Sequence, residues 1–321
     1  MSFKQRLQRL NERYGTLFIL LLMVVITTLL YPGFLSSTNL TNVVRQISII
    51  AIIAFGSTFV IISGGIDLSP GSIVGLTSVV VASLAHPGMY PVIVPILAGM
   101  IVGSLAGLVN GMLIAKTKIP PFIATLGMMI AARGAALIYS DGRPIGNFTK
   151  TFEFIGGGDF FGIPVPILIL VGLLILSHIL LNNTIFGLYT YAIGSNEQAA
   201  MISGINVNKH KVLIYMYAGL MASIAAIVLT SRISSGQPIA GVGFEMDAIA
   251  AAVIGGTSLS GGIGTIPGTV IGALIMGILN NAMDLLGVSA YWQQVFKGAI
   301  IVGAVILDQK RKIASNSSSN K

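Results

Sequence analysis

The sequence Ser63-Gly-Gly-Ile-Asp-Leu-Ser-Pro-Gly-Ser-Ile-Val-Gly75 lies between two apolar runs, and Ser260-Gly-Gly-Ile-Gly-Thr-Ile-Pro-Gly-Thr-Val-Ile-Gly272 repeats its pattern near the other end of the chain. Both contain Ser-Gly-Gly-Ile, three free positions, Pro-Gly, a hydroxyl residue, two β-branched residues and Gly. Glycine has little helical preference, and proline cannot donate a backbone hydrogen bond inside a helix, so each copy should interrupt or end a helix. We call these copies the first and second glycine elements. They predict two pseudo-repeat halves with broken helices.

The composition indicates an all-α polytopic membrane protein. Of the 321 residues, 54% are hydrophobic and only 9% are charged, and the mean hydropathy is +0.90. Soluble domains carry about 25% charged residues. Apolar runs repeatedly reach the roughly 17 to 25 residues that a membrane-spanning helix needs. The chain has no cysteine, so disulfides and cysteine metal sites are excluded.

Hydropathy predicts about ten membrane-spanning helices in one transmembrane domain, 1–321. The expected spans lie near 16–31, 43–63, 70–86, 91–115, 122–140, 164–181, 212–231, 246–260, 265–286 and 291–307. The first half then covers about 16–181, a cytoplasmic loop about 183–211, the second half about 212–308, and a disordered tail 313–321.

Positive charge orients these spans. Basic clusters follow the fourth, sixth and tenth spans, at Lys116 and Lys118, at Lys209 and Lys211, and from Lys310 to Lys312. Cytoplasmic loops are enriched in lysine and arginine, so both termini are expected in the cytoplasm. The formal net charge of +8 has the same origin, and it does not indicate a nucleic-acid partner.

The loop at 183–211 contains a short predicted helix. Ser195 and Gln198 have the Ser-x-x-Gln spacing of a capping box, and Gly204 can supply the left-handed residue that ends a helix. The spacing therefore predicts a two-turn helix at 196–203 with a small, mostly uncharged surface. It is either a docking helix for a soluble motor protein or simply a solvated loop with a helical turn.

The glycine elements also indicate a candidate transport route. Non-helical backbone at membrane depth occurs only where protein buries it or where it lines a wet cavity, and paired broken segments are typical of transporters. Two ordinary turns near the cytoplasmic face are the alternative. The candidate pathway residues are Gly65, Asp67, Ser69, Asn110, Thr125 and Asn280. Asp67 either caps the following span or meets solute, and the amides either bind a neutral polar solute or hold helices together.

The sequence does not predict an enzyme. A phosphate-binding loop of the form Gly-x-x-x-x-Gly-Lys-Ser/Thr is missing, as are the His-Glu-x-x-His and Gly-x-Ser-x-Gly motifs. The three histidines are too scattered to suggest a metal site. We expect no catalytic residues, no metal and no cofactor bound by this chain.

Five motifs, in order along nearly the whole chain, resemble the permease subunit of bacterial simple-sugar ABC importers. They are Gly-Gly-Ile-Asp-Leu-Ser-Pro-Gly-Ser from Gly64, Pro121-Phe-Ile-Ala-Thr-Leu-Gly127, Gly194-Ser-Asn-Glu-Gln-Ala-Ala200 with Ser-Gly-Ile-Asn-Val207, Asp247-Ala-Ile-Ala-Ala251 with Val-Ile-Gly-Gly-Thr-Ser-Leu259, and Leu279-Asn-Asn281.

The resemblance implies a homodimer of ten-span subunits, a cytoplasmic ABC ATPase that holds ATP and Mg²⁺, and an extracytoplasmic sugar-binding protein. The transported solute is then a simple sugar, ribose or a related monosaccharide. The ATPase-coupling residues it implies are Ser195, Asn196, Glu197, Gln198, Ala199, Ala200, Ser203 and Gly204. In the wider ABC-permease pattern Glu-Ala-Ala-x-x-x-Gly, Gln198 stands here in the position of the glutamate.

The rival hypothesis is an ion-coupled secondary transporter of a small polar solute, which also uses repeats and broken helices. Such a carrier needs an ion or proton site near the membrane centre, and Asp67 is its only plausible acidic residue. A docking helix separates the two hypotheses, since an ion-coupled carrier needs no site for a motor protein.

Overall fold

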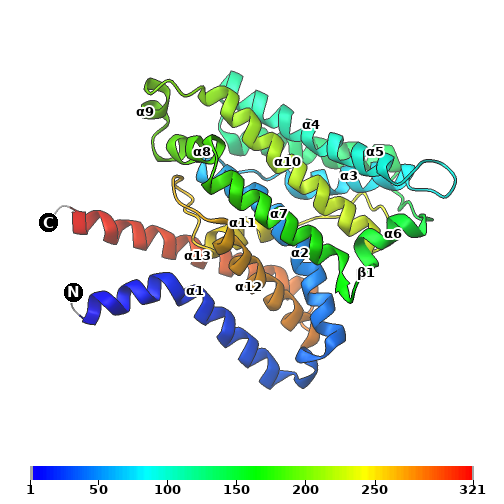
Figure 1. Cartoon of the computed structure of the whole chain (residues 1–321), viewed down its shortest axis with the longest axis horizontal. Helices are drawn as coiled ribbons and strands as arrows, with labels where there is room; N and C mark the ends of the chain where they lie inside the picture. The colour runs from blue at the N-terminus through cyan, green and yellow to red at the C-terminus, as the bar shows by residue number, and fades with distance from the viewer. Residues whose placement is uncertain (1–2, 320–321) are drawn as a thin grey trace.

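A computed structural model describes residues 3–319, with side chains described at 15–303 and at 306. Within that range, one short hairpin is the only strand structure and the rest is helices and their connections (Figure 1). In chain order the elements are α1 (Phe3–Leu30), η1 (Pro32–Leu35), α2 (Ser37–Ile62), α3 (Pro70–Leu84), α4 (Ile93–Thr117), α5 (Pro121–Ser140), α6 (Lys150–Gly157), β1 (Asp159–Phe160), β2 (Ile163–Pro164), α7 (Val165–Asn182), α8 (Ile185–Ser195), α9 (Glu197–Ile202), α10 (Val207–Arg232), α11 (Phe244–Ile254), α12 (Ile266–Leu285) and α13 (Ala290–Ser319).

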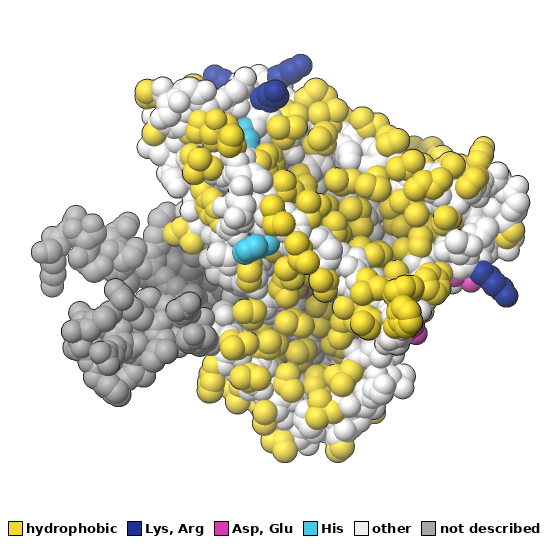
Figure 2. All heavy atoms as spheres, viewed as in Figure 1, with side chains coloured by type: hydrophobic (Ala, Val, Ile, Leu, Met, Phe, Trp, Pro, Cys, Tyr) yellow, Lys and Arg dark blue, Asp and Glu magenta, His cyan; other side chains and the backbone are white. Residues whose placement is uncertain are grey.

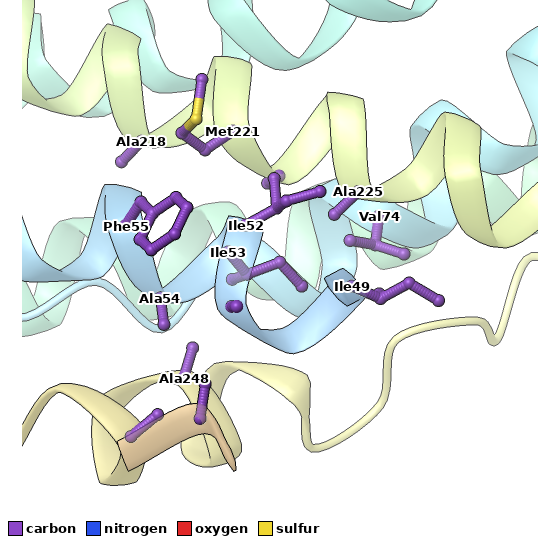
Figure 3. Packing of buried hydrophobic residues seen from close by; sticks show 14 of the residues in the cluster. Ile49, Ile52, Ile53, Ala54, Phe55, Val74, Ala218, Met221, Ala225 and Ala248 are labelled. Carbon is purple, nitrogen blue, oxygen red and sulfur yellow. The ribbon is translucent and has the colours of Figure 1, made fainter. Parts of the chain in front are cut away.

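Helix α2 lies at the centre of the molecule. Its residues from Ile47 to Ile62 are buried without exception, which fits a helix that is apolar on every face. Figure 3 shows its Phe55 and Ile52 facing Ala218 and Met221 of α10, while Ala248 of α11 packs from the opposite side. Helices α10, α11 and α12 thus surround α2 and fix the position of its C-terminal end.

A glycine stripe brings α4 close to α10. Gly103, Gly107 and Gly111 recur every four residues, and an added Cβ at each would overlap the backbone or β-carbon of a residue on α10. On α10 the reciprocal position is Gly219, where a Cβ would overlap the carbonyl oxygen of Gly103. Small residues at this spacing let two helices approach to backbone contact, which is how helices pack in a bilayer.

The outer surface has the character expected of a protein in lipid. Figure 2 shows apolar side chains over most of the visible face, with basic side chains gathered at the end where Figure 1 places α9. Six described helices, α2, α4, α5, α7, α10 and α12, are long and apolar enough to cross a membrane. Two shorter apolar segments, Gly15–Leu30 and Pro70–Leu84, accompany them. The protein is therefore all-helical and multi-pass.

The eighth expected span is shorter than the sequence indicated. We expected a helix over 246–260, but α11 ends at Ile254, and Gly256 follows with a left-handed φ of +94°. Eleven residues rise only about 17 Å, roughly half of a bilayer core. The apolar run is long enough, but its two glycines turn the chain before a full span is complete.

Both glycine elements end one helix and begin the next, as their residues predicted. The first connects α2 to α3 with Gly64 at φ +82°, and the second connects α11 to α12 with Gly261 at +83° and Gly262 at +75°. A proline stands in the first turn of the helix that follows each element. The local conformation is thus similar in the two copies.

The predicted disordered tail at 313–321 differs from the structure as far as the structure describes it. Helix α13 continues to Ser319, and residues 320 and 321 lie outside the described range. After Gly303 the sequence contains no glycine or proline, so nothing in the backbone chemistry stops the last helix.

Candidate functional site

The predicted short helix exists as α9, but a different residue caps it. The Oδ1 of Asn196 accepts a hydrogen bond of 2.9 Å from the backbone N–H of Ala199, whereas Ser195 is the last residue of α8. The expected capping box between Ser195 and Gln198 is therefore wrong, although the helix covers the expected residues. Asparagine is as good an N-cap as serine, and the end of α8 decides which of the two takes the role.

The C-terminal end of α9 forms as the sequence indicated. Gly204 adopts φ +85°, and the N–H of Ile205 reaches back to the carbonyl of Ala200 at 3.1 Å. The hydroxyl of Ser203 bonds to the carbonyl of Ala199 at 2.9 Å. These contacts make a short, well-terminated helical element rather than a frayed turn.

One side of α9 anchors it and the other side is open. Ala200 is buried and packs with Ile193 of α8 and Val207 of α10. Met201 and Ile202 point outward, and Ile202 is 88% exposed. Large apolar side chains that are exposed side by side on a protein surface are suited to contact with another protein.

An ion pair joins α9 to α10. The Nζ of Lys211 lies 2.8 Å from an oxygen of Glu197, and the lysine side chain is only 18% exposed. This pair ties the first turn of α9 to the start of a long, buried helix. The two helices are thus in direct contact through this pair.

Helix α8 meets both glycine elements at one place. The N–H of Gly262 donates to the carbonyl of Ile62 at 2.8 Å, and a Cβ added at Gly194 would overlap that carbonyl and come within 2.7 Å of the Gly262 nitrogen. We call Ile62, Gly194 and Gly262 the glycine junction. Chain segments about 130 and 70 residues apart converge there, next to α9.

Tyr191 of α8 supports the junction. Its hydroxyl donates to the carbonyl of Gly264 at 2.6 Å. Burial raises the pKa of Tyr191, so the phenol keeps the proton that this bond requires. The second glycine element is thus held to α8 through both a backbone contact and a side chain.

Four of the six candidate pathway residues form one buried group next to the first glycine element. Asp67 Oδ1 accepts from the backbone N–H of Ser69 at 2.8 Å and from its hydroxyl at 2.6 Å, and Asn110 donates to that hydroxyl at 2.9 Å. Thr125 completes the group with a bond of 3.3 Å to the carbonyl of Ile66. All four side chains are at most 2% exposed, so here they hold the loop in place.

The other two candidates lie outside that group. Gly65 packs against Tyr215 of α10, with no room for a Cβ beside the phenol oxygen. Asn280 is on α12, where it is 5% exposed, and its Oδ1 has no hydrogen-bond partner among the described residues. Sequence reasoning could not separate Asn280 from the other candidates, since only the packing of α12 shows where it lies.

Sequence reasoning missed the importance of another non-helical segment, 233–243, which connects α10 to α11. Arg133 of α5 donates to the carbonyls of Pro238 and Ala240, and to that of Gly71 at 3.1 Å. One guanidinium therefore fixes this segment to α3. The Gly- and Pro-rich composition of residues 236–243 was the signal available in the sequence.

A buried ion pair joins α11 to α13. Lys297 Nζ lies 2.8 Å from Asp247 Oδ2, and the Asp247 side chain is 3% exposed. Because α11 leads directly into the second glycine element, this pair links α13 to the region around α9.

Comparison with known proteins gives the family. Residues 39–305 match the family described as branched-chain amino acid transport system / permease component. The chain belongs to this permease family.

Curated relatives cover almost the whole permease. It is 52% identical over 302 residues to a ribose import permease protein of Bacillus subtilis, with 94% of each chain covered. It is 44% identical to the ribose import permease protein of Escherichia coli K12, over 92% of this chain and 94% of the relative. The L-arabinose transport system permease protein of the same organism is 41% identical, over 95% and 93%. No solved structure matches the chain. The protein is thus a transport component rather than an enzyme.

Proposed function

We propose that this permease is the membrane-spanning subunit of an ATP-driven importer of a simple sugar, ribose or a related monosaccharide. It works as a homodimer with a cytoplasmic ABC ATPase, which holds ATP and Mg²⁺, and an extracytoplasmic sugar-binding protein. The names of the relatives, two ribose permeases and an L-arabinose permease, support the sugar class.

The exposed face of α9 is the observation that carries the mechanism. Met201 and Ile202 form an apolar surface that an ATPase groove can cover, while Ala200 and the Glu197–Lys211 pair hold the helix to the membrane domain. ATP-driven closure of the ATPase pair pushes α9. The push passes through α8 to the glycine junction and through Lys211 to α10. It rocks the two halves of each subunit, so that a sugar pathway between the two subunits opens alternately to each side of the membrane.

Membrane placement follows the same proposal. We place the single transmembrane domain, with about ten spans in two pseudo-repeat halves, in the bacterial cytoplasmic membrane with both termini in the cytoplasm. The basic side chains of Lys116, Lys209 and Lys211 support that orientation, because positive loops stay inside. Weak polar contacts are enough for the sugar in the membrane, since a permease must release what it carries.

Assembly with the ATPase tests the role of α9. The permease in lipid nanodiscs is mixed with a ribose-type ABC ATPase, and binding and ATP hydrolysis are measured for wild type and Ile202→Ser. Loss of one buried isoleucine contact should weaken binding roughly tenfold. Ile163→Ser is the matched control, because it makes the same change on an exposed residue of the β1–β2 hairpin, at the end of the molecule away from α9.

Equal ATPase binding by Ile202→Ser and wild type would contradict the docking role of α9. Loss of binding by both variants would show a general defect and would contradict it as well. Stimulated hydrolysis without ribose uptake would keep the importer and change the sugar.

A further inference from the structure

A cavity of about 300 Å³ lies behind α9, at the lower end of the size range of small-molecule sites. It is lined by residues from five helices, α4, α5, α8, α9 and α10, and by the first glycine element. The lining residues are Ser63, Gly64, Gly65, Ile114, Pro121, Ile193, Gly194, Ser195, Asn196, Glu197, Lys211 and Tyr215. Of the six candidate pathway residues, Gly65 is the one that belongs to this lining.

The lining of the cavity combines apolar and polar groups. Ile114, Pro121 and Ile193 supply carbon surface, while the chain from Ser63 to Gly65 and the side chain of Ser195 supply hydrogen-bonding groups. A monosaccharide has the matching character, with C–H faces on its ring and hydroxyls around the edge.

A buried hydroxyl without a partner belongs to this cavity. Tyr215 is 1% exposed, and its phenol oxygen has no hydrogen-bond partner among the described residues. Gly65 lies directly beside that oxygen, and a Cβ there would overlap it. A buried hydroxyl is costly to leave unpaired, and Tyr215 is one of the residues that line the cavity, so a molecule in the cavity can supply the missing partner.

The charge in the cavity favours a neutral occupant. Among the described residues, Glu197 and Lys211 are the only charged side chains in its lining, and they are paired with each other at 2.8 Å. Their charges cancel, so the lining offers no net charge to attract an ion, and a polyhydroxy compound can bond to both members without separating them.

We propose that this cavity binds a neutral monosaccharide from the cytoplasm and that the bound sugar inhibits transport. The inference rests on the proposed function, which supplies imported sugar on that side of the membrane. A ligand there contacts α4, α5, α8, α9 and α10 together, so it holds α9 in its present position. Because transport needs α9 to move against these helices, accumulated product slows its own import.

Binding is tested first, without the sugar-binding protein. Labelled D-ribose or L-arabinose is added at millimolar concentration to the permease alone and to the permease–ATPase complex in nanodiscs. We expect saturable binding to both, and none of ribose 5-phosphate. Tyr215→Phe should weaken binding three- to tenfold, the effect of one hydrogen bond.

Tyr217→Phe is the matched control, since it removes a hydroxyl two residues away on α10 whose bond is to Ser177, outside the cavity. Binding unaffected by Tyr215→Phe, or weakened equally by both variants, would overturn the site. Binding to the permease alone but not to the complex would show that an ATPase side chain fills the cavity, and would overturn the regulatory role.

Inhibition is tested in vesicles that contain the three-component importer. Unlabelled sugar inside should lower the initial rate of labelled uptake severalfold, and Tyr215→Phe should relieve this inhibition while Tyr217→Phe should not. If empty vesicles import sugar but preloading has no effect, the inference fails and the proposed function stands. If sugar binds in a Tyr215-dependent manner but uptake is missing, the site stands and the proposed function fails.

Discussion

Replacing Gly194 with alanine should damage both stability and coupling, because the glycine junction has no space for a methyl group. A Cβ at this position overlaps the carbonyl oxygen of Ile62 and lies 2.7 Å from the nitrogen of Gly262. These two atoms form the 2.8 Å hydrogen bond that joins the end of α2, directly before the first glycine element, to the second element. Alanine must therefore push α8 away from both.

The magnitude follows from two contributions. Overpacking a well-packed site typically costs about 1 to 3 kcal/mol, and the lost backbone hydrogen bond costs about 1 kcal/mol more. The combined effect of roughly 2 to 4 kcal/mol should lower the unfolding temperature of the detergent-solubilised permease by several degrees, on the scale of about 2 °C per kcal/mol for a large domain. Coupled ATP hydrolysis should fall more steeply, since α9 follows Gly194 by only three residues.

Gly172→Ala is the control, since Gly172 also lies in a helix but an added Cβ there meets no atom within 4 Å. Alanine at that position should leave both measurements unchanged or raise the unfolding temperature slightly. If Gly194→Ala behaves like Gly172→Ala in both assays, the close contact at the junction is not what holds α8, and the route of force from α9 must be redrawn.

Three further outcomes are expected. A double-mutant cycle with Glu197→Gln and Lys211→Met should give a coupling energy of at most about 1 kcal/mol by thermal unfolding, because the Glu197 side chain is 47% exposed to solvent, yet each variant should lower coupled ATP hydrolysis. Lys297→Met should destabilise the permease by roughly 3 kcal/mol or more by leaving Asp247 buried and unpaired, and adding Asp247→Asn should restore most of the loss; no restoration would refute the pairing. Arg133→Lys should speed proteolysis of segment 233–243, since one ammonium cannot bond to three separate carbonyls; an unchanged cleavage rate would contradict the clamp.

Local chemistry was sufficient to predict most helix positions and both glycine elements. Glycine and proline act on their immediate neighbours, so the breaks at Gly64 and Gly261 are visible in the sequence. The eighth span was overestimated because hydropathy measures the length of an apolar run and does not register the left-handed turn at Gly256.

The choice between two adjacent caps required tertiary structure. Ser195 and Asn196 are both good N-caps, and α8 extends far enough to include Ser195 because Gly194 packs on Ile62. A single sequence does not show that two residues far apart along the chain are in contact. The same reason explains why the sequence did not predict the Tyr215 cavity or the Arg133 clamp, whose groups come from different helices.

The pathway residues illustrate the difference between composition and position. Asp67, Ser69, Asn110 and Thr125 share one hydrogen-bonded group, which no spacing in the sequence reveals because α2, α3, α4 and α5 each contribute or adjoin a member. Their role in transport stays a prediction. Asn110→Ala, read out by uptake and by unfolding temperature together, separates a solute contact from a structural one.

The most direct test of the proposed function is the energy source for sugar uptake. Vesicles that contain the permease, a ribose-type ABC ATPase and a ribose-loaded binding protein are assayed with ATP, and then without ATP but with an imposed proton or sodium gradient. We predict uptake that requires ATP and all three proteins and is lost in Glu197→Arg and Gly204→Trp. Uptake by the permease alone, driven by the ion gradient and abolished by Asp67→Asn, would contradict the importer and identify an ion-coupled carrier.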